Sequence, residues 1–146
     1  MRAVVQRVSS ASVSVAGDVI AAIGKGLLVL VAFQAEDATA DLTYLAEKIV
    51  NLRIFEDEAD KMNLSLQDVA GELLIVSQFT LYGDVRRGRR PSFTASAPAA
   101  IAERLYEEFL QLCRNLGVAV ASGQFQAHME VALVNDGPVT LLIDSK

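Results

Sequence analysis

Cysteine and histidine are almost absent from this chain of 146 residues. Cys113 is its only cysteine, so no disulfide can form within the chain, and His128 is its only histidine. The closely spaced cysteines and histidines of a zinc site are therefore missing, and we expect neither a metal nor another cofactor. A protein that cannot form an internal disulfide fits a reducing compartment, and we expect a cytoplasmic location.

Long apolar runs are missing as well. No stretch reaches the roughly 18 uncharged apolar residues of a membrane-spanning helix, and the first seven residues, Met1–Arg7, do not form a secretory leader. We therefore expect no contact with a membrane.

Positive charge is also scarce, since 13 Lys and Arg residues face 18 Asp and Glu residues and the net charge is −5. A protein that holds nucleic acid by its overall field needs the opposite balance, so we expect no DNA binding, and any contact with RNA must be local. Such a contact could come from the one basic cluster, Arg86, Arg87, Arg89 and Arg90. Two interpretations stay open for this cluster: a solvated loop that aids solubility, and a loop that binds phosphates.

What is present predicts one domain over residues 1–146, because about 100 to 200 residues form a typical domain. Valine-rich and other apolar runs indicate strands, and leucines at helical spacing indicate two helices. The expected strands are residues 2–15, 19–23, 27–33, 72–76, 118–121, 129–134 and 139–143, and the expected helices surround Leu42–Ile49 and Ile101–Leu116. The pattern predicts an α+β fold: a mixed, barrel-like sheet with two main helices packed on it.

Polar residues follow the apolar run that ends at Val76. Ser77, Gln78, Phe79 and Thr80 place two hydroxyl groups and an amide at the end of a buried strand. These groups either satisfy the amides of a turn or form a site, with Thr80 as a nucleophile or the local backbone amides as an oxyanion hole. No Ser/Thr-His-Asp triad is visible, because the neighbours of His128 indicate strand packing, so the oxyanion hole is the preferred interpretation.

A second unusual segment is Asn135-Asp136-Gly137-Pro138, which we expect to be a turn between two strands. Proline directly after glycine restricts the backbone there and allows a cis peptide bond. Phe93, Phe125 and Met129 could line a pocket, although such residues more often fill a core. The acidic residues at 56–60 lack the pattern of a calcium loop and are expected to be solvated.

The chain resembles the D-aminoacyl-tRNA deacylase family along its whole length. The matching stretches occur in order: residues 1–8, 24–29, 48–55, 77–81, 88–93 and 135–140, which include Ser77-Gln78-Phe79-Thr80-Leu81 and Asn135-Asp136-Gly137-Pro138-Val139-Thr140. The resemblance implies a homodimer that hydrolyses the ester of D-aminoacyl-tRNA at its 3′ end and spares L-aminoacyl-tRNA. Two alternatives remain at this stage, an RNA-binding module without catalysis and a small-molecule esterase or peptidase that uses Thr80.

The resemblance also implies roles for particular residues. Residues 77–80 form a catalytic wall, and Gly137-Pro138, with a cis bond, enters the partner subunit's site to reject L-amino acids, with Arg7 holding it in place. Phe125, Ala127 and Met129 receive the terminal adenosine, and Arg89 and Arg90 contact the tRNA. Because a clash with L side chains does not exclude glycine, glycyl-tRNA is an expected substrate too.

Overall fold

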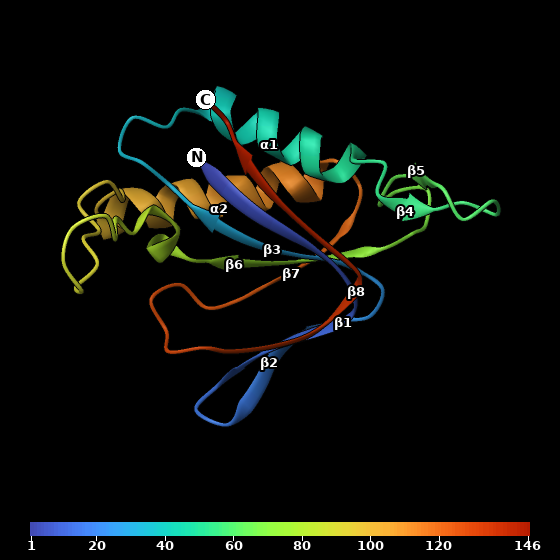
Figure 1. Ribbon diagram of the computed structural model, residues 1–146, viewed down its shortest axis with the longest axis horizontal. Coiled ribbons are helices and arrows are strands. Elements are labelled where there is room, and N and C mark those ends of the chain that lie inside the picture. The colour runs from blue at the N-terminus through green and yellow to red at the C-terminus, as the bar shows by residue number, and fades with distance from the viewer.

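The computed structural model describes all 146 residues and confirms the α+β architecture. Two helices lie together on one side of a strongly curved, barrel-like mixed sheet, which curls away from them toward β2 (Figure 1). The elements are β1 Arg2–Val15, β2 Asp18–Ile23, β3 Gly26–Ala32, α1 Thr39–Asn51, β4 Phe55–Glu56, β5 Met62–Leu64, β6 Glu72–Ser77, the 3-10 helix η1 Phe79–Tyr82, α2 Ala99–Asn115, β7 Ala119–Ser122 and β8 Glu130–Asp144. No helix is both long and apolar enough to cross a membrane.

The long strand β1 organises the sheet, whose strand order is β2-β1-β3-β6-β7 with β8 also paired to β1. The first half of β1 pairs with β3, and the second half pairs with β2. Strand β8 runs antiparallel to both halves. The pairs β3-β6 and β6-β7 are parallel, so their carboxyl ends meet at one edge of the sheet.

Both faces of the central strands are buried. The predicted central strand β3 is covered as expected, and the larger core lies between the sheet and the helices. Phe109 of α2 is fully enclosed there, and burial among these side chains raises the pKa of Cys113 to about 12. On the other face a smaller cluster, with Val8, Leu28 and Leu74 among its members, fills the inside of the curl.

The helix boundaries follow from local signals in the sequence. Asp41 in the first turn of α1 accepts a hydrogen bond from the Ala38 amide at 2.9 Å, which satisfies one N–H group that a helix start leaves open. The same hydrogen bond lowers the pKa of the Asp41 carboxyl. Helix α2 starts after Pro98, and Gly117 follows its end with φ of +83°, a conformation that glycine adopts readily. The small hairpin β4-β5 had not been predicted, because its strands are too short to show a pattern.

The predicted turn at residues 135–138 is wrong. Strand β8 continues from Glu130 to Asp144 without reversing, and both parts pair with β1. Val8 pairs with Asn135 and Gln6 pairs with Thr140, so residues 136–139 bulge out opposite Arg7 alone. The Asn-Asp-Gly-Pro sequence is typical of a turn, but the backbone pairing that resumes beyond it keeps the strand direction.

Arg7 holds this bulge from inside the protein, with only 4% of the residue exposed. Its Nη1 donates to the Ile54 carbonyl at 2.7 Å, and its Nε donates to the Asp136 carbonyl at 3.2 Å. The carboxylates of Asp136 and Glu56 lie 3.3 and 3.7 Å from the guanidinium. One buried cation therefore joins β1, the bulge of β8 and the segment before β4.

We predict that Arg7→Met lowers the free energy of unfolding by about 2 to 3 kcal/mol, because the buried Ile54 carbonyl loses a charged donor. Arg86→Met is the control: Arg86 forms an ion pair with Asp84 at 2.6 Å, but its side chain is 86% exposed, and we expect a much smaller loss. Urea unfolding at one protein concentration measures both. Equal losses would contradict the role given to Arg7.

Candidate active site

The candidate site begins where β6 leaves the sheet. Its interior residues, Leu73 to Val76, are fully buried, whereas Ser77 and Gln78 are partly exposed. The Gln78 amide donates to the Val31 carbonyl at 2.7 Å, and η1 then turns the chain away from β3. The predicted polar strand end therefore lies at the edge where the parallel strands finish.

Thr80 lies beside this strand end without a visible base. The Gln78 side-chain amide donates to the Thr80 hydroxyl, and Thr80 itself is exposed. A carboxamide cannot take the hydroxyl proton, so this arrangement positions Thr80 without activating it as a nucleophile.

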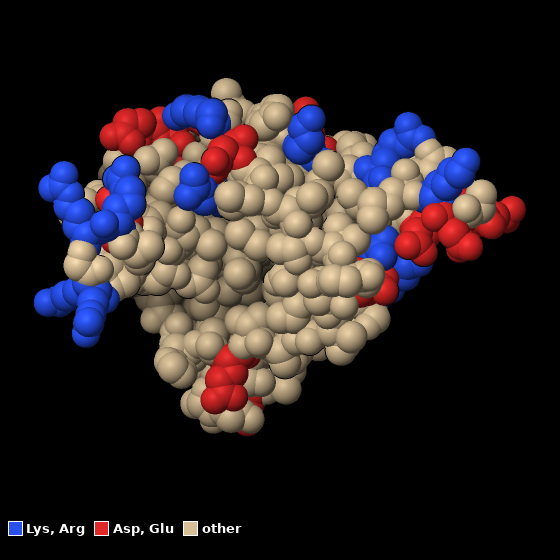
Figure 2. All heavy atoms as spheres, in the orientation of Figure 1, with Lys and Arg blue, Asp and Glu red and all other residues tan.

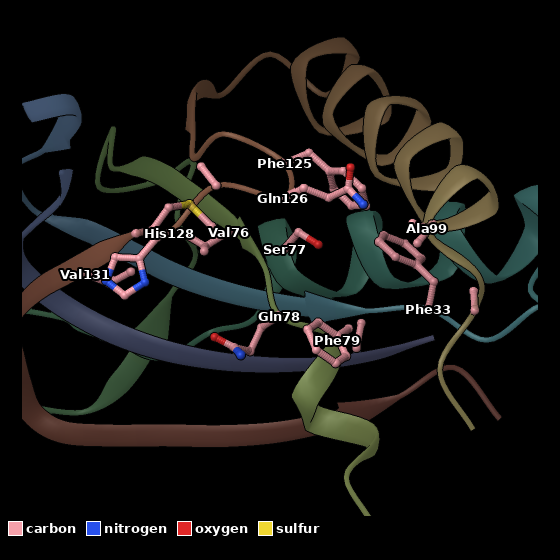
Figure 3. A pocket seen from close by; sticks show the side chains of 15 residues that line it. Phe33, Val76, Ser77, Gln78, Phe79, Ala99, Phe125, Gln126, His128 and Val131 are labelled. Atoms are coloured by element: carbon pink, nitrogen blue, oxygen red, sulfur yellow. The ribbon is translucent and has the colours of Figure 1, made fainter. Parts of the chain in front are cut away.

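A pocket of about 570 Å³ opens next to the strand end, a size typical of small-ligand sites. Figure 3 shows it between the end of β6, the start of α2 and the loop before β8. Most of its 15 lining residues are hydrophobic: Ala32, Phe33, Val76, Ser77, Gln78, Phe79, Ala97, Ala99, Ala102, Phe125, Gln126, Ala127, His128, Met129 and Val131. An apolar ring or side chain fits this lining, with polar groups left to orient it.

The loop of residues 123–129 forms one wall, and a single carbonyl anchors it. The Ile75 carbonyl of β6 accepts hydrogen bonds from the Gly123 amide at 3.0 Å and from the Tyr106 hydroxyl of α2 at 2.8 Å. The Tyr106 ring also lies 5.9 Å from the Phe125 ring, centroid to centroid. Burial raises the pKa of Tyr106 to about 12, so its hydroxyl stays protonated and continues to donate. A Cβ atom at position 123 would lie 2.7 Å from the Met129 sulfur, so a larger residue there would displace the Met129 side chain from its place in the pocket wall.

The pocket unites two of the predicted groups. Ser77, Gln78 and Phe79 line it together with the three residues predicted to receive adenosine, Phe125, Ala127 and Met129. Thr80 stands just outside this lining. Phe93, a further candidate, also lies outside it and packs edge-on against Phe79 with the ring centroids 5.2 Å apart.

Two lining residues had been misjudged or missed. His128 is exposed in the pocket and does not pack in a strand as expected, because β8 begins only at Glu130. Gln126 had received no role. What distinguishes Gln126 in the structure is a positive φ of +61°. This conformation depends on the three-dimensional path of the loop and could not be predicted from the sequence.

The Gly137-Pro138 pair does not line this pocket in the same chain. Its peptide bond is cis, both residues are exposed, and the pair belongs to the bulge that Arg7 holds. A Cβ atom at position 137 would lie 2.7 Å from Nη2 of Arg7, and φ of +118° there also favours glycine. The bulge is therefore a tightly held projection that lies outside this chain's own pocket.

The basic cluster projects from one end of the molecule (Figure 2). Asp84 and Ser92 bridge the base of this loop through two backbone hydrogen bonds of 2.7 and 3.0 Å. Asp84 also binds the Arg86 guanidinium, which lowers the pKa of the Asp84 carboxyl to about 2. Arg89 and Arg90 make no ion pair, so their positive charge faces solvent. No group of three or more His, Cys, Asp or Glu side chains is arranged to hold a metal ion.

Comparison with known proteins places this chain in a family. The family model described as D-Tyr-tRNA(Tyr) deacylase matches residues 4–144. The D-aminoacyl-tRNA deacylase of Thermosipho africanus (strain TCF52B) is 62% identical over 146 residues, which cover 100% of this chain and 98% of that protein. The D-aminoacyl-tRNA deacylase of Clostridioides difficile (strain 630) is 60% identical over 145 residues, or 99% of this chain and 97% of that protein.

Solved structures agree with the family match found from the sequence. A structure named c-Myc DNA Unwinding Element Binding Protein superposes with a TM-score of 0.94 at 43% identity and covers 100% of this chain and 99% of its own. A probable eukaryotic D-amino acid tRNA deacylase has a TM-score of 0.83 at 21% identity, covers 98% of each chain and shows the shared fold. Since the family model matches nearly the whole chain and the two bacterial relatives align over nearly their full lengths, the chain belongs to the D-aminoacyl-tRNA deacylases, hydrolases that act on an ester bond.

Proposed function

We propose that this chain hydrolyses the ester bond of D-aminoacyl-tRNA and of glycyl-tRNA, and so acts in chiral proofreading. The products are the free amino acid and the tRNA. The observation that carries the proposal is the pocket beside the polar end of β6, in a chain that belongs to this family. Its apolar walls suit a base and an amino-acid side chain, and Ser77 and Gln78 supply polar groups for the ester.

The chemistry demands little of the protein. An aminoacyl ester on ribose is already activated, and the vicinal ribose hydroxyl can assist the attack of water. Positioning and stabilisation of the oxyanion by donors of the 77–80 segment then account for catalysis. This mechanism suits a site in which Thr80 has an amide and no base as its partner.

Discrimination between the D and L substrates requires a larger contribution from the protein than the hydrolysis itself. Rejection of L-aminoacyl-tRNA by a factor of about 10⁴ requires roughly 5.5 kcal/mol, whereas a misfit of one methylene group gives only about 1 to 3 kcal/mol. The backbone carbonyls of Gly137 and Pro138 would supply this penalty by a clash with an L side chain. The contacts of Arg7 with the bulge support this role, because an excluding wall must not yield.

The bulge would act in a second copy of the chain, so the enzyme is a homodimer in this proposal. Strand β8 exposes the apolar side chains of Leu133, Val134 and Leu142, of which the last two are 56% and 62% exposed. Apolar residues gathered on an edge strand are typical of a surface that another chain covers. A two-fold axis would place each Gly137-Pro138 at the pocket of its neighbour.

Binding of the tRNA would use both the pocket and the basic loop. Phe125, Ala127 and Met129 form an apolar wall on which the terminal adenosine can lie. Arg89 and Arg90 face solvent without ion pairs and can reach backbone phosphates, which suits a chain whose overall charge repels RNA. The enzyme needs no metal or other cofactor in this proposal.

We predict that the protein cleaves D-tyrosyl-tRNA and glycyl-tRNA, and that it cleaves L-tyrosyl-tRNA about 10⁴-fold more slowly than D-tyrosyl-tRNA. Glycine has no side chain to clash, so exclusion admits it. Release of the labelled amino acid from each of the three substrates measures the rates. If the protein cleaves the D substrate but not glycyl-tRNA, selectivity comes from recognition of the D side chain and not from exclusion of the L side chain. If it cleaves none of the three substrates, the proposed function is wrong.

We predict that Thr80→Ala keeps measurable activity, with a loss of at most about 10³-fold, the range for one transition-state donor. Removal of a protein nucleophile would lower the deacylation rate much more, by about 10⁶-fold. Single-turnover deacylation of D-tyrosyl-tRNA compares this variant with Thr94→Ala, which changes an exposed threonine outside the pocket. A folded Thr80→Ala protein with only the uncatalysed rate would identify Thr80 as the nucleophile.

We predict that Val134→Glu produces a monomer and removes most of the activity, because a carboxylate on the edge of β8 opposes burial between two copies. Met62→Glu is the matched control, since Met62 is 54% exposed on β5, away from β8. Sedimentation equilibrium and the deacylation rate are measured on the same samples. A fully active monomer of either variant or of the unchanged protein would exclude an active site shared between subunits.

A further inference from the structure

Gln126 holds a backbone conformation that a side chain makes costly. Its φ is +61°, and only three other residues besides glycine have a positive φ: Ala16, Asp60 and Ala70. None of those three lines the pocket, whereas Gln126 does. A left-handed conformation costs a residue with a Cβ atom roughly 1 to 2 kcal/mol, and such strain is concentrated at functional sites.

The side chain of Gln126 has no structural task that would explain this cost. It is exposed, and its carboxamide makes no hydrogen bond within the protein. Figure 3 shows the carboxamide extending from the loop toward the part of α2 that holds Ala99, beside Phe125. A donor and an acceptor are thus presented together at the edge of an aromatic wall.

The other polar side chains of the pocket are less suited to this position. The amide nitrogen of Gln78 is already bonded to Thr80, and Ser77 has a single hydroxyl group. His128 lies at the opposite end of the pocket beside Val131 (Figure 3). Gln126 is therefore the side chain that can offer a coplanar donor and acceptor to a ring lying against Phe125.

We propose that the Gln126 carboxamide recognises the 3′-terminal adenine of the tRNA. This inference rests on the proposed function and adds a residue that determines specificity for the base. The carboxamide oxygen accepts from the exocyclic amine of adenine, and its NH₂ group donates to a neighbouring ring nitrogen. Both polar edges of adenine include the exocyclic amine, so the pairing needs this amine whichever edge faces the loop. Stacking on Phe125 supplies affinity, and Gln126 supplies selectivity.

The test compares two D-tyrosyl-tRNAs that differ only in the terminal base, adenine or the analogue without the amine, purine. We expect the unchanged protein to show a kcat/KM about tenfold higher with adenine, the size of one bidentate contact. Gln126→Gly should reduce this ratio to about one, because it removes the oxygen that accepts from the amine and so lowers kcat/KM more for the adenine substrate than for the purine substrate. Its melting temperature should stay the same or rise, because glycine adopts the left-handed conformation without strain.

Two further variants separate recognition from loop structure. Gln124→Gly adds the same flexibility two residues earlier, at an exposed residue outside the pocket lining, and should keep the tenfold ratio. Gln126→Glu keeps an oxygen that accepts from the amine but loses the NH₂ group that donates to the ring nitrogen, which both bases carry, so it should lower kcat/KM for both substrates and keep the preference for adenine.

The outcomes are distinct. If Gln126→Gly keeps the same preference for adenine, or if the unchanged protein cleaves both substrates equally, the inference is overturned while the deacylase function stands. A substantial loss of stability in Gln126→Gly would also overturn it, because the side chain would then support the fold. If the unchanged protein cleaves neither substrate, the proposed function and this inference fail together.

Discussion

The hydrogen bonding of β1 is the constraint on which the rest of the structure depends. This strand lies in the middle of a curled sheet, so the N–H and C=O groups on both of its edges need partners. Strand β8 supplies one edge along nearly the whole length, while β3 and β2 share the other. Continuous pairing forces the Asn-Asp-Gly-Pro segment into a bulge, and Arg7 at that point fills the space behind it.

The pocket depends in turn on the Ile75 carbonyl. Helix α2, strand β6 and the 123–129 loop meet there through the Tyr106 hydroxyl and the Gly123 amide. The two walls of the pocket, the end of β6 and the 123–129 loop, are therefore fixed to one atom of the same strand. A site that works by positioning benefits from such a short connection, because a displacement of about 1 Å is costly for catalysis.

Much of this could be predicted from local patterns. The buried run Leu27–Ala32, the helical leucines of α1 and the polar strand end after Val76 all lie where their spacing indicated. The path of β8 could not be predicted, because a turn sequence and a bulge sequence look alike until the pairing with β1 is known. The backbone of Gln126 and the exposure of His128 likewise depend on contacts between distant segments. The family resemblance named the pocket residues that spacing alone could not assign.

The burial of Cys113 has a consequence for the redox chemistry of this protein. Peroxides attack the thiolate form of cysteine, and burial that raises the pKa of this thiol to about 12 leaves almost none of that form at neutral pH. The side chain is also fully enclosed on the inner face of α2, out of reach of glutathione and of other thiols. The one sulfhydryl group of the protein is therefore shielded both from oxidation and from exchange with other thiols.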